Sequence, residues 1–304
     1  NSTTINLLNI TQKEVNLTTQ IQQCGSSISA NFEFGDNYVC GNLGLNITSS
    51  ASIEGNNLNL TGNGSGIGID FFQVNYSKVN RLQIQNFSQG VRFSYSNNSN
   101  LTRMRIVNNS IGIYFDHSNN NKVYDSIIGN NTNISIYAVN DGETNNSLIN
   151  VSIYNLANIS IQGGATIYRK WYVDVNVTFN NHLPLASANV TAFFNSTSTL
   201  DTFGTTDGNG RVRLEVTELK VNSSEIFYYT PHSLNVSFLV QGEYIKNSTY
   251  INLTQTNNTL INLNLILNCT APSNNLLLTT GTTTFCPGTY IIENITINAS
   301  GAQL

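Results

Sequence analysis

The sequence predicts an all-β protein in which a parallel β-helix is followed by a β-sandwich. Short apolar runs alternate with polar residues and are bounded by Asn, Ser and Gly, which is typical of strands and turns. The stretches "GIGIDFFQ", "GVRFSYSN" and "GIYFDHSN" begin at Gly68, Gly90 and Gly112, so one pattern returns every 22 residues. From Tyr172 this register ends, and longer strands with strict alternation follow.

A step of 22 residues fits either leucine-rich repeats or a parallel β-helix. The repeated apolar residues are mostly Ile, Val and Phe rather than Leu, which favours the β-helix. Stacked coils place the same position of each turn about 4.8 Å apart, so like residues should form ladders. The expected ladders are Ile69, Val91 and Ile113; Phe71, Phe93, Phe115 and Tyr137; Val79, Leu101 and Val123; and Ile84, Ile106, Ile128 and Ile153.

Asparagines follow the last of these ladders two residues behind, at Asn86, Asn108, Asn130 and Asn155. The first three also begin Asn-x-Ser/Thr sequences, the acceptor pattern for N-linked glycans. A residue cannot be both a buried ladder member and a glycan site. We expect Asn86, Asn108 and Asn130 to form an internal ladder at a corner of the coil.

The composition indicates an exported glycoprotein. Only 10% of residues are charged and the net charge is −4, so no basic surface for nucleic acid is expected, and no apolar run is long enough to span a membrane. About 27 Asn-x-Ser/Thr sequences are present, and the chain begins at Asn1 without a signal peptide, as in a mature or trimmed product. We expect N-linked glycans and no other cofactor. The predicted glycosylation sites are Asn9, Asn16, Asn46, Asn59, Asn75, Asn97, Asn100, Asn133, Asn145, Asn176, Asn189, Asn195, Asn222, Asn235, Asn247, Asn252, Asn257 and Asn294.

The four cysteines fall into two local pairs, Cys24 with Cys40 and Cys269 with Cys286. An even number with paired spacing indicates two disulfides formed in an oxidising compartment. A zinc site would need closer cysteines or neighbouring histidines, and the three histidines lie elsewhere. No metal site is expected.

The coils, together with "IEGNNLNLTGNGSGIGI", resemble the right-handed parallel β-helix superfamily, including pectate-lyase-like and periplasmic copper-maturation-type repeats. The stretches 184–190 (PLASANV) and 206–212 (TDGNGRV) resemble carboxypeptidase-regulatory-like and immunoglobulin-like modules, which are mostly spacers and adhesion units. The composition resembles that of surface proteins of thermophilic archaea. These resemblances imply a β-helix over 23–167 and an immunoglobulin-like sandwich over 172–266.

The two termini suggest assembly. Residues 269–301 resemble residues 24–55, so the segment 267–304 is expected to be similar to a β-helix cap. It could continue into another β-helix, fold back on the sandwich, or dock on the next subunit. Residues 1–22 are strand-like and are a second candidate for exchange between subunits. Head-to-tail exchange gives an open filament when the rotation does not close.

Enzymes of the β-helix superfamily need clustered carboxylates or a bound cation. Asp70, Arg92, Asp116 and His117 form the one constellation that the repeat suggests, with Asp70 and Asp116 about 10 Å apart in a single column and Arg92 or Ser94 between them. We interpret it as a set of solvated residues on an outer face, with no catalytic role. Asp207-Gly208-Asn209-Gly210 is expected to be a hairpin turn, and Trp171 to cover the open end of the β-helix.

The sequence therefore predicts a structural extracellular glycoprotein at the cell surface, not an enzyme. It would be the subunit of a filament or surface layer, assembled from like copies through its terminal β segments. The alternatives are a secreted β-helix protein that acts on or binds polysaccharides, and a cell-surface adhesin.

Overall fold

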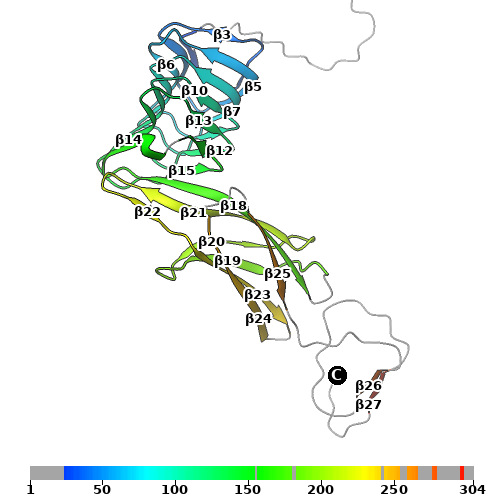
Figure 1. Cartoon of the computed structure of the whole chain (residues 1–304). Coiled ribbons are helices and arrows are strands. Elements are labelled where there is room, and N and C mark those ends of the chain that lie inside the picture. The colour runs from blue at the N-terminus through cyan, green and yellow to red at the C-terminus, as the bar shows by residue number, and fades with distance from the viewer. Residues whose placement is uncertain are drawn as a thin grey trace, which may run out of the picture.

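The computed structural model describes residues 24–154, 156–179, 183–240, 243–253, 259–265, 276–278 and 295–297. Their regular structure is β-strand, apart from one short 3-10 helix, η1 (Leu156–Asn158). The all-β prediction is confirmed. A parallel β-helix forms one end of the molecule, and a second part made of two sheets follows it (Figure 1).

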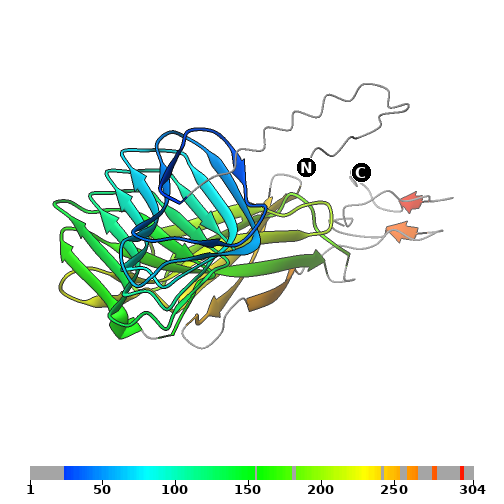
Figure 2. The same ribbon diagram turned by 90° about the horizontal axis from the view of Figure 1, so that it is seen from above.

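Seven parallel strands, one from each successive turn, form the first sheet of the β-helix. Figure 2 shows these turns stacked behind one another. Because every strand except the two at the edges has a neighbour on both sides, the backbone groups of each turn are hydrogen-bonded by the adjacent turns. In order across the sheet the strands are β1 (Ser26–Ile28), β4 (Leu43–Ile47), β6 (Ile67–Phe72), β8 (Gln89–Ser94), β11 (Ile111–Asp116), β14 (Ile134–Asn140) and β17 (Ile159–Gly163).

The other walls of the β-helix belong to a 14-stranded sheet that continues into the second part. Its β-helix strands are β2 (Phe32–Glu33), β3 (Tyr38–Val39), β5 (Ser52–Thr61), β7 (Lys78–Gln85), β9 (Asn100–Thr102), β10 (Arg105–Val107), β12 (Lys122–Tyr124), β13 (Ile127–Gly129), β15 (Asn146–Ile149) and β16 (Ser152–Ile153). The strands beyond them are β18 (Ile167–Phe179), β21 (Arg211–Val221), β22 (Ile226–Tyr228) and β25 (Thr259–Leu265).

The pairing of these strands confirms the predicted ladders except at one position. Phe71, Phe93 and Phe115 stack inside the coil, with ring centroids 4.5 and 5.2 Å apart. Tyr137 does not continue this stack, because the step between β11 and β14 is one residue longer and Ala138 pairs with Phe115. Successive residues of a strand point to opposite faces, so this single insertion turns Tyr137 outward. The aliphatic ladders follow the expected register.

The expected internal ladder of Asn86, Asn108 and Asn130 is wrong. These residues are exposed and have left-handed backbone conformations, with φ of 60°, 57° and 53°. Asn adopts this conformation more readily than most residues, so it forms the corner and points outward. Asn155 lies outside the described residues.

The buried ladder begins one residue later. The Asn109 Oδ1 accepts a hydrogen bond from the Phe87 N–H at 3.0 Å, and the Asn131 Oδ1 accepts one from the Asn109 N–H at 3.1 Å. A second ladder runs through Ser99 and Asn121 at another corner. These side chains satisfy backbone donors that bend away from the strands.

The glycine that opens each repeat is required by the close approach of successive turns. A Cβ added to Gly90 would lie 2.7 Å from the carbonyl oxygen of Gly112 and 2.8 Å from Ile106 Cγ2. No larger residue fits this position without moving the backbone of the next turn.

One long strand joins the β-helix to the second part. β18 pairs in parallel with β15 at its start, then antiparallel with β21 and in parallel with β25. The predicted boundaries at 167 and 172 thus both fall within β18. Across the junction, the Glu143 carboxylate accepts hydrogen bonds from Lys220 Nζ at 2.6 Å and from the Tyr168 hydroxyl at 2.9 Å.

The second part has its own hydrophobic core, between β18, β21 and β25 and a four-stranded antiparallel sheet. Trp171 belongs to this core and donates from Nε1 to Glu218 at 2.6 Å, so the expectation that it covers the end of the β-helix is wrong. An immunoglobulin-like topology stays a prediction. The four-stranded sheet consists of β20 (Leu200–Thr205), β19 (Asn189–Phe194), β23 (His232–Val240) and β24 (Glu243–Ile251).

Two features concern the predicted caps. Cys24 and Cys40 form a disulfide in the first turn, as predicted. Cys269 and Cys286 lie outside the described residues, as does the segment 1–22. Within 267–304, the strands β26 (Leu276–Leu278) and β27 (Ile295–Ile297) pair in parallel.

Candidate functional site

The outward face of the seven-stranded sheet collects polar and aromatic side chains from consecutive turns. One column is set by the register of β4, β6, β8, β11, β14 and β17. Since the residues on either side of each member point into the core, this column lies on the outer side of the sheet. Asp70 is only 7% exposed, contrary to the expectation of a solvated residue, and the other members are half-buried. Its members, in order along the β-helix, are Asn46, Asp70, Arg92, Tyr114, Tyr137 and Ser160.

Asp70 and Arg92 form a two-point ion pair across adjacent turns. Arg92 donates from Nε to Asp70 Oδ1 at 2.9 Å and from Nη2 to Oδ2 at 2.6 Å. The hydrogen bonds to Asp70 raise the pKa of Arg92 above its ordinary value, against the opposing effect of burial. The pair fixes both side chains in one geometry on the face.

Asp116 and His117 form a second pair at the end of β11. His117 Nδ1 lies 2.7 Å from Asp116 Oδ1, and the Ser94 hydroxyl donates to Asp116 Oδ2 at 2.8 Å. His117 Nε2 lies 3.8 Å from the exposed Asp141 carboxylate, so the imidazole stands between two acidic side chains. Asp116 fixes the orientation of this ring.

Aromatic rings border both pairs. The Tyr95 ring stacks on His117 with centroids 5.0 Å apart, and Tyr114 meets Tyr137 edge to face at 4.9 Å. Burial, and then the nearby Asp116 carboxylate, raise the pKa of Tyr114. Its hydroxyl stays protonated at neutral pH and keeps its hydrogen-bond donor.

The four residues that the repeat suggested are thus brought together, but not in a single column. Asp70 is in register with Arg92 and Tyr114, whereas Asp116 is in register with Ser94. Two turns and two residues of offset place the Cα atoms of Asp70 and Asp116 about 12 Å apart. Each carboxylate has partners of its own, Arg92 for Asp70 and Ser94 with His117 for Asp116, which does not favour a shared acid–base role.

The three residues Ser94, Asp116 and His117 do not form a catalytic triad either. The Ser94 hydroxyl donates to Asp116 rather than to His117, so no base is placed to activate it. The face offers a ligand aromatic rings and hydrogen-bonding side chains, among them His117, whose Nε2 is turned toward the exposed Asp141.

Sequence reasoning missed the tyrosines of this face. Tyr114 lies between the inward-facing Ile113 and Phe115, so strand alternation is the signal that could have identified it as outward-facing. Tyr137 was hidden by the one-residue insertion, and Tyr95 by a left-handed corner, with φ of 52°, that ends the alternating pattern.

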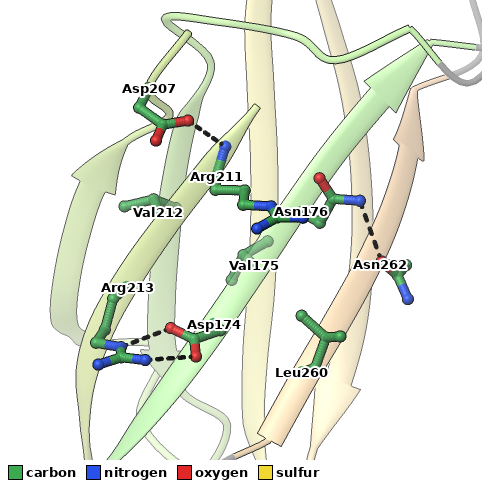
Figure 3. A pocket seen from close by; sticks show the side chains of 9 residues that line it. All are labelled: Asp174, Val175, Asn176, Asp207, Arg211, Val212, Arg213, Leu260 and Asn262. Carbon is green, nitrogen blue, oxygen red and sulfur yellow. Dashed lines mark hydrogen bonds and ion pairs between the residues drawn. The ribbon is translucent and has the colours of Figure 1, made fainter. Parts of the chain in front are cut away.

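A second hollow, of about 500 Å³, lies on the polar face of β18, β21 and β25 (Figure 3). Asp174 receives hydrogen bonds from Arg213 Nε at 2.7 Å and Nη2 at 2.8 Å, which lower the pKa of Asp174. Asn176 Nδ2 donates to Asn262 Oδ1 at 3.2 Å. The Asp174–Arg213 and Asn176–Asn262 pairs thus bond to one another within the hollow, as Asp70 and Arg92 do on the outer face.

No group of three or more His, Cys, Asp or Glu side chains able to hold a metal ion occurs within the described residues. The expected hairpin turn is present at Asp207, whose Oδ1 accepts hydrogen bonds from the N–H groups of Asn209 and Arg211, both at 2.9 Å. In the part of the chain that the structure describes, no helix has the length and apolar character needed to cross a membrane.

The predicted glycosylation asparagines that the structure describes are all at least partly exposed. Their occupancy stays a prediction. Asn9, Asn16, Asn257 and Asn294 lie outside the described residues.

No protein-family description and no curated protein matches the chain. Among solved structures, the chain is similar to an alginate lyase from Paenibacillus sp. str. FPU-7, with a TM-score of 0.40 and 16% sequence identity. The similarity covers 46% of this chain and 62% of the lyase, less than two thirds of its length. It concerns the fold, and no residue role is transferred from it.

This comparison corrects one expectation. The sequence predicts a protein that is not an enzyme, whereas a solved chain to which this one is similar is an alginate lyase. The expectation is contradicted, and we do not retain it.

Proposed function

We propose that this protein binds polysaccharide along the outer face of its seven-stranded sheet. The observation that carries the proposal is the column of outward side chains on consecutive turns, in which Tyr114 and Tyr137 adjoin the Asp70–Arg92 pair. A tyrosine ring presents an apolar surface and a polar hydroxyl, and so do sugars. A polymer of sugars can contact a ladder that repeats at each turn.

The charge of the face indicates which polysaccharides fit. Asp70, Asp116 and Asp141 carry three negative charges, and Arg92 already neutralises one of them. The remaining negative charge repels a polyanion. We therefore infer that an uncharged polysaccharide is preferred here, held by stacking and by hydrogen bonds to the fixed carboxylates and guanidinium.

Affinity electrophoresis against a panel of neutral and uronate-containing polysaccharides tests the proposal. We expect the double variant Tyr114→Ala/Tyr137→Ala to lose at least tenfold in affinity for the retained polysaccharide. The matched control is Tyr244→Ala/Tyr250→Ala, two tyrosines of the four-stranded sheet that are 59% and 69% exposed. Equal retention of both variants, or no retention of the wild type by any polysaccharide, would reject it.

We propose end-to-end assembly as a second candidate function. It is supported by β26 and β27, in which Leu276 pairs with Ile295, a step of 19 residues. In the first turn of the β-helix Ser26 pairs with Leu45, again a step of 19 residues. β26 and β27 thus repeat the spacing of an opening coil. Electron microscopy of the wild type and of a chain lacking 267–304 tests this, with filaments or lattices expected only from the wild type. A place at the cell surface stays a prediction.

A further inference from the structure

A cavity of about 380 Å³ lies where the β-helix meets the second part. One wall comes from β12, β15 and β18, whose register places Lys122 beside Ser147 and Ser147 beside Tyr168. The opposite wall comes from Phe194 and Asp201 at the ends of β19 and β20, and from Tyr229. The cavity exists because β18 carries one part directly against the other.

Two lysines line this cavity without an acidic partner. Lys122 and Lys170 are half-buried, and neither forms a salt bridge within the described ranges. Lys220, on the neighbouring strand β21, differs in that it is paired with Glu143 at 2.6 Å. Lys122 Nζ lies 5.9 Å from the centre of the Tyr124 ring, a contact that leaves its charge unneutralised. The lining thus includes two lysines whose charge is available to a ligand.

The acid that lines the cavity forms no ion pair with either lysine. The Asp201 side chain is 4% exposed, and its two oxygens accept hydrogen bonds from the backbone N–H and the hydroxyl of Thr217, both at 2.7 Å. His232 Nε2 lies 3.4 Å from the same carboxylate on its buried side. Asp201 is therefore committed to the protein interior.

An aromatic wall completes the cavity. The rings of Phe194 and Tyr229 are stacked, with centroids 4.2 Å apart and planes inclined by 25°. Asn120 and Ser147 also line the cavity and carry neutral hydrogen-bonding groups. Together these groups offer an apolar plane, two cations and neutral hydrogen-bonding groups in a space of sugar size.

We propose that this junction cavity binds a carboxylate-bearing sugar, with the carboxylate between Lys122 and Lys170 and the sugar ring against Phe194 and Tyr229. Its charge preference is opposite to that of the outer face, so this is a separate site. It stands whether or not the outer face binds polysaccharide.

Isothermal titration calorimetry with trigalacturonate, using the whole chain, tests the proposal. We expect binding that weakens with added salt, and a loss of at least tenfold in affinity in Lys122→Gln/Lys170→Gln. Lys220→Gln is the matched control and should bind as the wild type does. Galactotriose, which lacks the carboxylate, should bind at least tenfold more weakly, and Tyr114→Ala/Tyr137→Ala should bind normally.

The contrary outcomes are distinct. Undiminished trigalacturonate binding by the double lysine variant overturns the site, provided that its circular dichroism spectrum matches that of the wild type. Equal binding of galactotriose overturns the carboxylate preference. Competition by sodium sulfate at the same concentration as trigalacturonate overturns sugar recognition and leaves a simple anion site. Phe194→Leu checks the aromatic wall independently, with at least a threefold loss expected.

Discussion

The side-chain oxygen of Asn131 accepts a hydrogen bond from the backbone N–H of Asn109, one turn earlier, at 3.1 Å. The Asn109 side chain in turn donates from Nδ2 to the Val107 carbonyl at 3.0 Å and accepts from the Phe87 N–H at 3.0 Å. Each turn therefore supplies the bonds that the bend of its neighbour lacks. The corner is fixed by the stack and not by any single turn.

Replacement of Asn109 by Ala should lower the free energy of unfolding by about 2–3 kcal/mol, because buried backbone groups lose their partners. Asn109 is fully buried. The control is Asn133→Ala, an exposed residue of the following turn, for which a change below about 0.5 kcal/mol is expected. Urea unfolding followed by circular dichroism measures both. Equal losses would mean that the buried ladder contributes nothing specific.

Replacement of Gly90 by Ala should cost about 2–3 kcal/mol, since the new methyl group meets the backbone of the next turn. Gly41→Ala serves as the control, because a Cβ there would have no neighbour within 4 Å. Thermal unfolding of the two variants in parallel gives the comparison. A Gly90→Ala protein as stable as Gly41→Ala would show that the turns can separate at little cost.

Loss of the Cys24–Cys40 disulfide should lower the free energy of unfolding by about 3 kcal/mol, as expected for a loop of this length. The double variant Cys24→Ser/Cys40→Ser is compared with the wild type in guanidinium chloride. Because the bond lies in the first turn, hydrogen exchange should rise most in β1 and β4. Exchange that rises uniformly along the β-helix would contradict this.

Alkaline pH should destabilise the protein through Tyr172. Burial, and then the nearby Asp125 and Glu215 carboxylates, raise the pKa of Tyr172 to about 12. The folded state therefore holds this proton more tightly than the unfolded state does. Its contribution to stability is complete below about pH 10, the ordinary tyrosine pKa, and is lost as pH rises to about 12.

Absorbance titration of tyrosinate in the wild type and in Tyr172→Phe isolates this group. The difference between the two curves should have its midpoint near pH 12, and the variant should lose less stability between pH 10 and 12. A difference curve centred at pH 10 would show that the pKa of Tyr172 is not raised in the folded protein.

The β-helix could be predicted from the sequence because stacked turns bring equivalent residues together, and this requires a repeated pattern. The ladders of Ile84 and Val79 followed from the step of 22 residues alone. The Asn ladder was placed one residue early, because the left-handed corner at Asn108 breaks the alternation from which the inward side was inferred. Whether an asparagine adopts a left-handed conformation depends on its contacts with the neighbouring turn. The amino-acid sequence of the repeat alone does not reveal it.

The candidate sites show the same division. Asp116 and His117 were named from their position in the repeat, whereas the pairing of Asp70 with Arg92 needed the register to choose between two columns. The junction cavity could not be predicted at all. It depends on how β18 brings β12 against the end of β19, a contact between segments far apart in the sequence.

The shared strand β18 also has a mechanical consequence. The first residues of β18 are hydrogen-bonded to β15 of the β-helix, and its later residues are hydrogen-bonded to β21 and β25. The β-helix and the second part are therefore joined by a continuous strand and not by a flexible linker. A force that pulls on the second part is transmitted along β18 to the β-helix. The backbone hydrogen bonds between β18 and β15 would then be loaded in shear, all at once, so they would have to break together before the two parts separate.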